Sequence, residues 1–285
     1  MIDLHMHSDY SDGKLSVEEL FEEVKRRGIT TFSLTDHDNC EGAVRMEELS
    51  KASGIQFIKG VEFSCLMDID VPESDCHILG YDFDLNDEEI NELQKRSLDL
   101  RKEKLEELLN FIETEYGFVL KDDAKARLRA NRKVGKPNVA DEMIKAGFCT
   151  KENVWNNYLE NFNSKKHPGA EETIKIIKNT GGIAIWAHPL GDNQEPENRD
   201  TVKQFSPKFE KMMSFGIDGI ECCYSKYLEK EIQFLIKIAN ENNLYITGGS
   251  DYHGKKDGII KVGDTGREKN HSEDLVKFVN YLGGR

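Results

Sequence analysis

Histidines and carboxylates recur in this sequence at short spacings that suit metal coordination. His5 and His7 are two residues apart in an apolar stretch, and Asp251 and His253 repeat that spacing near the end of the chain. Side chains two apart on a strand point to the same face, so each pair presents two donors together. Imidazole and carboxylate groups at this density are suited to Zn, Mn or Fe. The histidines that we expect to gather at one site are His5, His7, His37, His77, His188 and His253.

An alternation of apolar strands with amphipathic helices would position these donors, and it predicts an α/β sheet or barrel. Ser16 and Glu19 have the spacing of a capping box before a helical apolar pattern, and Gly28 is placed to end that helix. Because the carboxyl ends of parallel strands share one edge, histidines at or just beyond those ends should converge. Strands are predicted at 2–5, 29–34, 55–63, 77–83, 183–188, 217–223 and 244–253.

Some polar residues near these donors have a simpler expected role than metal binding. Asp36 and Asp38 flank His37. We expect Asp36 to act as a hydrogen-bond partner behind the ligands and Asp38 to cap the helix that follows. His167 precedes a proline and His271 lies at a predicted helix start, so both are expected to be structural.

The alternation stops near Asn86, where a long, charged, helix-favouring stretch begins and continues to about His167 without a strand pattern. This stretch is the predicted insert. We therefore expect a barrel whose first part is 1–85 and whose second part is 169–285, with 86–168 as a helical cap subdomain beside the histidines.

The overall composition narrows the class of protein. The chain has 285 residues and a formal net charge of −14. It has no apolar run near the ~18 residues of a membrane span and no signal-peptide pattern, so we expect a cytoplasmic protein without a membrane partner. The acidic balance argues against binding long nucleic acid. The six cysteines lack a CxxC pair and are expected to be reduced.

Two other metal-binding patterns begin in a similar way. His5, His7 and Asp9 match the first part of HxHxDH, as used by metallo-β-lactamase-like hydrolases, but Tyr10 replaces the next histidine and the match fails. Amidohydrolase barrels also begin with HxH on their first strand. They remain structural relatives of the predicted fold.

Six segments resemble, in order, the motifs of the polymerase and histidinol phosphatase (PHP) superfamily of metal-dependent phosphoesterases: DLHMHSDYSDG, SLTDHD, GVEFS, CHILGY, AHP and GSDYHG. The resemblance covers about 1–85 and 169–285. It implies an α/β fold, a distorted seven-stranded (β/α) barrel of PHP type with an inserted helical subdomain, and two or three divalent metal ions. The positions that match the family's ligands are His5, His7, Asp12, His37, Glu62, His77, His188, Asp251 and His253.

The same resemblance implies how the ligands divide among the ions. One ion would take His5, His7, Glu62 and Asp251, a second Glu62, His77 and His188, and a third Asp12, His37 and His253. Two ions bridged by Glu62 would lower the pKa of a shared water and supply hydroxide for attack on phosphorus. Glu62, Asp251 and His253 are the predicted catalytic residues.

The insert resembles the helical subdomain of PHP phosphoesterases that act on nucleotides, where a GRPH-like motif contacts phosphate. Here the segment reads GKPNVADEM. The predicted substrate-binding residues are Arg129, Arg132, Lys133, Lys136 and Asn138.

The sequence is compatible with three functions. The first is hydrolysis of a phosphate ester of a small nucleotide, either a 3′,5′-bisphosphate nucleotide or a short RNA end. The second is a histidinol-phosphate phosphatase or another small-molecule phosphomonoesterase. The third is a module that binds partners without catalysis, which the intact set of ligands argues against. A small phosphorylated molecule is the expected partner.

Overall fold

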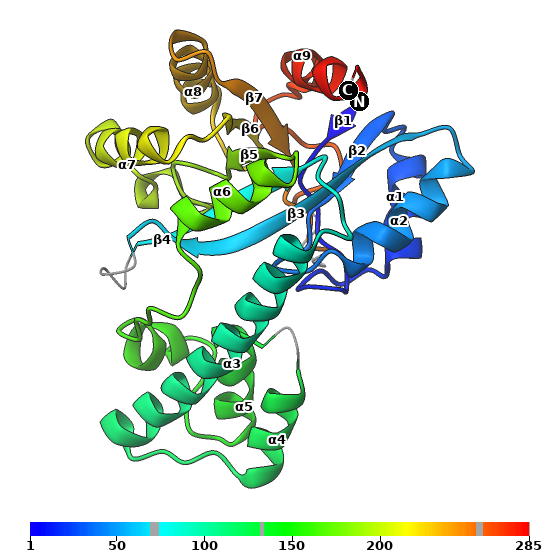
Figure 1. The fold of residues 1–285 in the computed structure, drawn as a ribbon. Helices are drawn as coiled ribbons and strands as arrows, with labels where there is room; N and C mark the ends of the chain where they lie inside the picture. The colour runs from blue at the N-terminus through cyan, green and yellow to red at the C-terminus, as the bar shows by residue number, and fades with distance from the viewer. Residues whose placement is uncertain (69–73, 132–133, 255–258, 285) are drawn as a thin grey trace.

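Seven strands follow one another in chain order around a single sheet in the computed structural model, which describes residues 1–68, 74–131, 134–254 and 259–284 (Figure 1). Each strand is hydrogen-bonded to the next along the chain. The strands are β1 (Ile2–Asp3), β2 (Thr31–Leu34), β3 (Gln56–Leu66), β4 (Asp75–Tyr81), β5 (Ile183–Trp186), β6 (Gly219–Tyr224) and β7 (Tyr245–Gly249).

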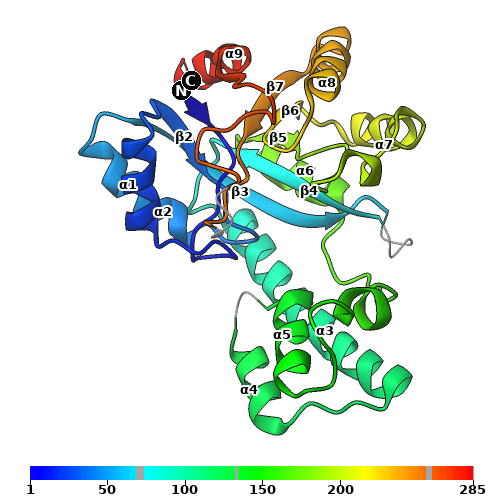
Figure 2. The same cartoon turned by 180° about the vertical axis from the view of Figure 1, so that it is seen from behind.

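The first and last strands nearly close the sheet into a barrel. The Leu4 amide donates a hydrogen bond to the Gly248 carbonyl at 3.1 Å. Gly249 permits this approach, because a Cβ at that position would lie 2.4 Å from the His5 nitrogen. The two chain termini lie side by side at this seam (Figures 1 and 2). The fold is the predicted distorted seven-stranded α/β barrel.

One strand runs against the others. β4 is antiparallel to both β3 and β5, and the remaining neighbours are parallel. β3 ends at Leu66 and β4 begins at Asp75, which leaves too few residues for the crossover that a parallel pair needs. The expectation that His77 follows the carboxyl end of a strand is therefore wrong. His77 lies near the start of a reversed strand, which is at the same edge of the barrel.

Helices cover the outside of the barrel, and the first of them begins and ends as predicted. Ser16 and Glu19 form the capping box of the first helix, and Gly28 follows its end with a positive φ of 68°. No helix in the described ranges is long and apolar enough to cross a membrane. These helices are α1 (Val17–Arg26), α2 (Glu41–Lys51), α6 (Ala170–Asn179), α7 (Val202–Phe215), α8 (Glu229–Glu241) and α9 (Ser272–Gly283), with a 3₁₀ turn at Pro196–Asn198.

The remaining helices project from one side of the barrel (Figures 1 and 2). The long α3 connects the two parts, since Ile90 and Leu93 pack in the barrel core while Leu108 and Ile112 belong to a separate apolar cluster. That cluster gives the group a core of its own. The group comprises α3 (Glu88–Tyr116), α4 (Asp122–Ala130), α5 (Lys136–Lys145) and a π-helix at Trp155–Leu159.

Candidate metal centre and its surroundings

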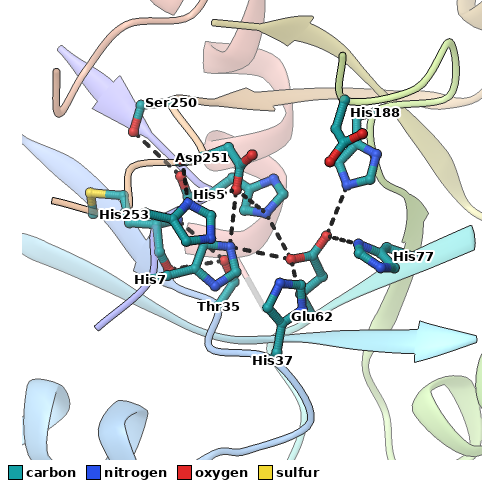
Figure 3. A network of polar contacts seen from close by, with 12 residues as sticks. His5, His7, Thr35, His37, Glu62, His77, His188, Ser250, Asp251 and His253 are labelled. Carbon is teal, nitrogen blue, oxygen red and sulfur yellow. Dashed lines mark hydrogen bonds and ion pairs between the residues drawn. The ribbon is translucent and has the colours of Figure 1, made fainter. Parts of the chain in front are cut away.

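Glu62 lies at the centre of the histidine cluster, on β3 (Figure 3). Its Oε2 is 3.1 Å from His5 Nε2 and 3.2 Å from His7 Nε2. Its Oε1 is 2.9 Å from His77 Nδ1 and 3.1 Å from His188 Nε2. His37 Nδ1 also lies 3.3 Å from Oε2. The two oxygens of one buried carboxylate thus face two different groups of histidines, and two ions could share such a carboxylate.

Asp251 completes the first group of donors at the end of β7. Its Oδ1 lies 3.1 Å from His7 Nε2 and 3.5 Å from His5 Nε2. Its Oδ2 accepts a hydrogen bond of 2.7 Å from Tyr224 Oη. Asp251 and His188 both adopt positive φ, at 52° and 26°. Non-glycine residues rarely hold this conformation outside sites that require it.

A third group gathers at the exposed side of the cluster. His253 Nε2 is 3.1 Å from Asp12 Oδ1, and His7 Nδ1 is 3.8 Å from the same oxygen. The donor atoms of His7, Asp12, His37 and His253 all lie within 4.8 Å of one another. His37 also falls in a group with Glu62 and His77, so it lies between the second and third predicted positions. The structure brings all nine predicted donors together.

The donors fit divalent metal ions. His7 Nε2 and His37 Nδ1 are buried and face carboxylate oxygens at 3.1 to 3.3 Å, but no hydrogen bond of good geometry forms to either nitrogen among the described residues. Burial lowers the pKa of His7, but Asp251 and Glu62 outweigh it and raise that pKa to about 10. Burial opposes ionisation of Glu62, yet the surrounding histidines, His5 foremost, hold its pKa well below the ordinary range. The carboxylates therefore attract positive charge, which divalent ions would supply.

A buried carboxylate that the sequence analysis missed lies behind these donors. Glu221 Oε1 is 2.9 Å from His5 Nδ1, and Glu221 Oε2 accepts a hydrogen bond of 2.8 Å from the His188 amide. It is fully buried on β6. The sequence did indicate this residue, because Glu221 is the one carboxylate in the apolar segment GIECCY, and a charge inside an apolar strand needs a partner.

Asp36 orders the loop that carries Asp12. It acts as a hydrogen-bond partner behind the metal donors, as expected. The carboxylate accepts hydrogen bonds from the Ser8 amide and the Ser8 hydroxyl, both at 2.7 Å, and from Ser11 Oγ at 2.6 Å. Burial raises the pKa of Asp36, although His7 and these donors oppose the rise.

The predicted capping role of Asp38 is wrong. α2 begins at Glu41, whose amide donates to Asn39 Oδ1, so Asp38 lies too early to cap it. The Asp38 carboxylate instead accepts a hydrogen bond of 3.0 Å from the Ser64 amide and pairs with Arg101 of α3. This pair places the middle of α3 beside the segment that carries His37.

Two predicted substrate-binding residues are engaged by neighbouring groups. The Arg129 guanidinium donates two hydrogen bonds to the Glu106 carboxylate, at 2.7 and 2.8 Å. Asn138 Oδ1 accepts a bond of 2.9 Å from the Gly135 amide at the start of α5.

Of the other three predicted substrate-binding residues, the structure describes only Lys136. Lys136 Nζ donates to the Phe162 carbonyl at 2.7 Å and lines a cavity. Arg132 and Lys133 lie outside the described residues.

The cavity lined by Lys136 has a volume of about 240 Å³ and lies between the β3–β4 hairpin and the projecting helices. Arg101, Lys104 and His167 also line it, with Lys104 Nζ 2.6 Å from His167 Nε2. Burial and the Lys104 ammonium lower the pKa of His167 to about 3, so this imidazole is neutral and accepts from Lys104. Arg101 and Lys104 were not anticipated, and His167 was expected to be only structural.

Comparisons with solved structures define the class of this protein. A protein from Bifidobacterium adolescentis assigned as a metal-dependent phosphoesterase superposes with a TM-score of 0.73 at 25% identity, over 100% of this chain and 98% of that one. An amidohydrolase from Chromobacterium violaceum with bound sulfate superposes at 0.77 and 22% identity, over 99% and 96%, which shows the fold alone. With its cluster of donors, the chain is a metal-dependent phosphoesterase.

The sequence comparisons then identify the family. A model of the PHP domain matches residues 3–247, and the chain belongs to that family. A 5′-3′ exoribonuclease of Haemophilus influenzae is 29% identical over 88% of this chain and 89% of its own length. A 3′,5′-nucleoside bisphosphate phosphatase of Chromobacterium violaceum is 25% identical over 96% and 92%. A phosphoribosyl 1,2-cyclic phosphate 1,2-diphosphodiesterase of Eggerthella lenta is 25% identical over 92% and 97%.

Proposed function

We propose that this phosphoesterase hydrolyses a phosphate ester of a small nucleotide that carries a second phosphate, such as a 3′,5′-bisphosphate nucleotide or a short RNA end. The names of the relatives support this class of substrate, since they include a nucleoside bisphosphate phosphatase and an exoribonuclease. The ions, two or three of Mn, Zn or Fe, would be held by the nine donors that the structure brings together.

The observation that carries the proposal is the cationic cavity next to the donors. Ser64 lines that cavity and lies two residues after Glu62, so both side chains occupy the same face of β3. His77 is the cross-strand partner of Ser64. The cavity is therefore adjacent to the histidines, along the hairpin, at a place where one phosphate of a substrate could bind while another faces the donors.

The charges around this cavity suit a phosphate. Arg101 is paired with Asp38, whereas the Lys104 ammonium has the neutral His167 as its neighbour. Burial, with the like charges of Lys136 and Arg101, lowers the pKa of Lys104 despite Asp75. A dianionic phosphate would relieve this repulsion and accept hydrogen bonds from both lysines. The helices that supply these lysines would then act as a specificity cap.

At the reacting phosphate, bound ions would supply an activated water and neutralise phosphoryl charge. The protein's own part is to hold charge in place. Glu62 keeps its two oxygens directed at separate groups of histidines, and Asp251 is oriented through Tyr224. We place Glu62, Asp251 and His253 in the reaction itself, because each lies among the donors that line the open pocket of about 380 Å³.

A second candidate is histidinol phosphate, and one feature favours it. A pocket beside His77 and His188 is lined by Asp75, Asp192 and Asp200, of which Asp200 is paired with Lys208. Carboxylates would bind an ammonium group better than the hydroxyls of a nucleoside.

The two candidate substrates can be distinguished by measuring how a substitution in the cationic cavity changes KM for a bisphosphate and for a simple phosphate monoester. We expect Lys104→Met to raise KM for adenosine 3′,5′-bisphosphate by about 10-fold or more while KM for p-nitrophenyl phosphate stays within about 2-fold, as for a lost charged hydrogen bond. The exposed Lys175→Met of α6 is the matched control. Faster turnover of histidinol phosphate than of any nucleotide, or equal KM effects on both phosphates, would favour the second candidate.

A further inference from the structure

Lys226 follows β6 and reaches the pocket that contains the metal donors. Its side chain is only 17% exposed. Of the residues that line this pocket within 1–68, 74–131, 134–254 and 259–284, Lys226 is the only lysine or arginine. A single cation in a pocket of carboxylates and imidazoles needs an explanation, particularly in a chain with a net charge of −14.

Lys226 forms only a long ion pair with Asp251. The Lys226 ammonium is 3.6 Å from Asp251 Oδ2, which is beyond hydrogen-bond distance. That oxygen already accepts from Tyr224 Oη at 2.7 Å. Asp251 Oδ1 faces His5 and His7 on the opposite side of the carboxylate. Lys226 is therefore near the donor cluster without competing for the positions that ions would occupy.

The ammonium keeps donors available toward the pocket. Among the described residues it donates one hydrogen bond of 2.9 Å, to the Asp192 carbonyl, and its nitrogen lies 5.3 Å from the centre of the Tyr224 ring. A lysine ammonium has three N–H donors. At least one can therefore point to an anion in the pocket while the contact with Asp192 is maintained.

The residues on either side of Lys226 are held by hydrogen bonds, so the position of the Lys226 backbone is fixed. Ser225 Oγ donates a hydrogen bond of 2.7 Å to the Ser250 carbonyl. Tyr227 Oη accepts one of 2.8 Å from the Leu190 amide, and Tyr227 is fully buried. A cation held in this way is preorganised for the charge of a substrate.

From these contacts we propose that Lys226 binds the phosphoryl group that is hydrolysed, by donating a hydrogen bond to one of its non-bridging oxygens. This assignment rests on the proposed phosphoesterase function of the same pocket. It makes Lys226 a substrate-binding residue that acts on every phosphate ester alike, in contrast to Lys104 and Lys136, which would contact a second phosphate.

The test compares Lys226→Met with Lys226→Arg in the metal-loaded protein. The probe is inorganic phosphate, whose binding is measured calorimetrically and does not require turnover. We expect Lys226→Met to weaken phosphate binding by about 10- to 100-fold, as for a lost charged hydrogen bond, and Lys226→Arg to restore most of it. Metal content per chain should be unchanged. The exposed Lys237→Met of α8 is the control.

Two outcomes would overturn the assignment. Unchanged phosphate affinity in Lys226→Met would remove Lys226 from the phosphoryl group, and loss of metal from that variant would make it a residue that supports Asp251. The effect on kcat/KM should be the same factor for p-nitrophenyl phosphate and for a nucleotide, and an effect confined to the nucleotide would also contradict it. If the wild-type protein hydrolyses no phosphate ester, the proposed function fails, while the binding measurement still decides the role of Lys226.

Discussion

Glu221 holds His5 from the side opposite to the shared carboxylate: Glu221 Oε1 lies 2.9 Å from His5 Nδ1, while Glu62 Oε2 lies 3.1 Å from His5 Nε2. A histidine whose Nδ1–H donates to a buried carboxylate presents Nε2 as a donor to metal, and its basicity rises. The same Glu221 binds the His188 amide. One residue outside the predicted ligand set therefore orients two members of it.

Replacing Glu221 should weaken metal binding without removing a ligand. We expect Glu221→Gln to lower affinity for the metals by about 10- to 100-fold, the range typical of partners that orient ligands. The measurement is competition against a chelator of known affinity. Glu241→Gln, an exposed change on α8, should leave the affinity unaltered. Equal affinities for wild type and Glu221→Gln would show that His5 is oriented without Glu221.

The low pKa of His167 predicts how stability depends on pH. Burial and Lys104 lower that pKa to about 3, below the ordinary value of 6.5, so the unfolded chain binds this proton more readily than the folded one. The free energy of unfolding should therefore fall as pH drops from about 6.5 toward 3, with a slope of at most about 1.4 kcal/mol per pH unit from this group. Denaturant titrations of metal-free protein should show a shallower loss in His167→Gln. Identical pH profiles would contradict the buried neutral imidazole.

Because the projecting helices have a core of their own, a cavity made in that core should lower their free energy of unfolding. Ile112 is 1% exposed within that cluster, whereas Val119 nearby is 53% exposed. Ile112→Ala should destabilise the helices by about 2–5 kcal/mol, and Val119→Ala should have little effect. Metal content should stay at the wild-type level, because all nine donors lie on the barrel. Loss of metal in Ile112→Ala would show that the helices are needed to build the centre.

Much of the barrel could be read from short-range patterns. The capping box of Ser16 and Glu19 depends only on residues three apart. His5 and His7 present their donors to the same site as predicted, although β1 ends at Asp3 and both histidines follow it. The resemblance to PHP motifs added the order of the remaining donors. These features are local, and the fold preserves them.

Features that depend on long-range contacts were not predicted. The reversal of β4 depends on the short connection after Leu66, which a pattern of apolar residues does not reveal. Lys104 and His167 are 63 residues apart and meet only because the chain comes back from the projecting helices alongside α3 before α6 begins. Asp38 was assigned to a nearby helix, whereas its partner Arg101 comes from α3. Contacts of this kind need the tertiary structure.

A metal centre in which two ions share Glu62 should hydrolyse phosphate esters. The most direct test measures release of inorganic phosphate from adenosine 3′,5′-bisphosphate by the metal-loaded wild-type protein and by Glu62→Gln, purified in parallel. The wild type should release phosphate and lose that activity on chelation, and Glu62→Gln should be slower by at least ~100-fold, as when a preorganised charge is removed. Near-normal phosphate release by Glu62→Gln, or full activity in the presence of chelator, would contradict the account.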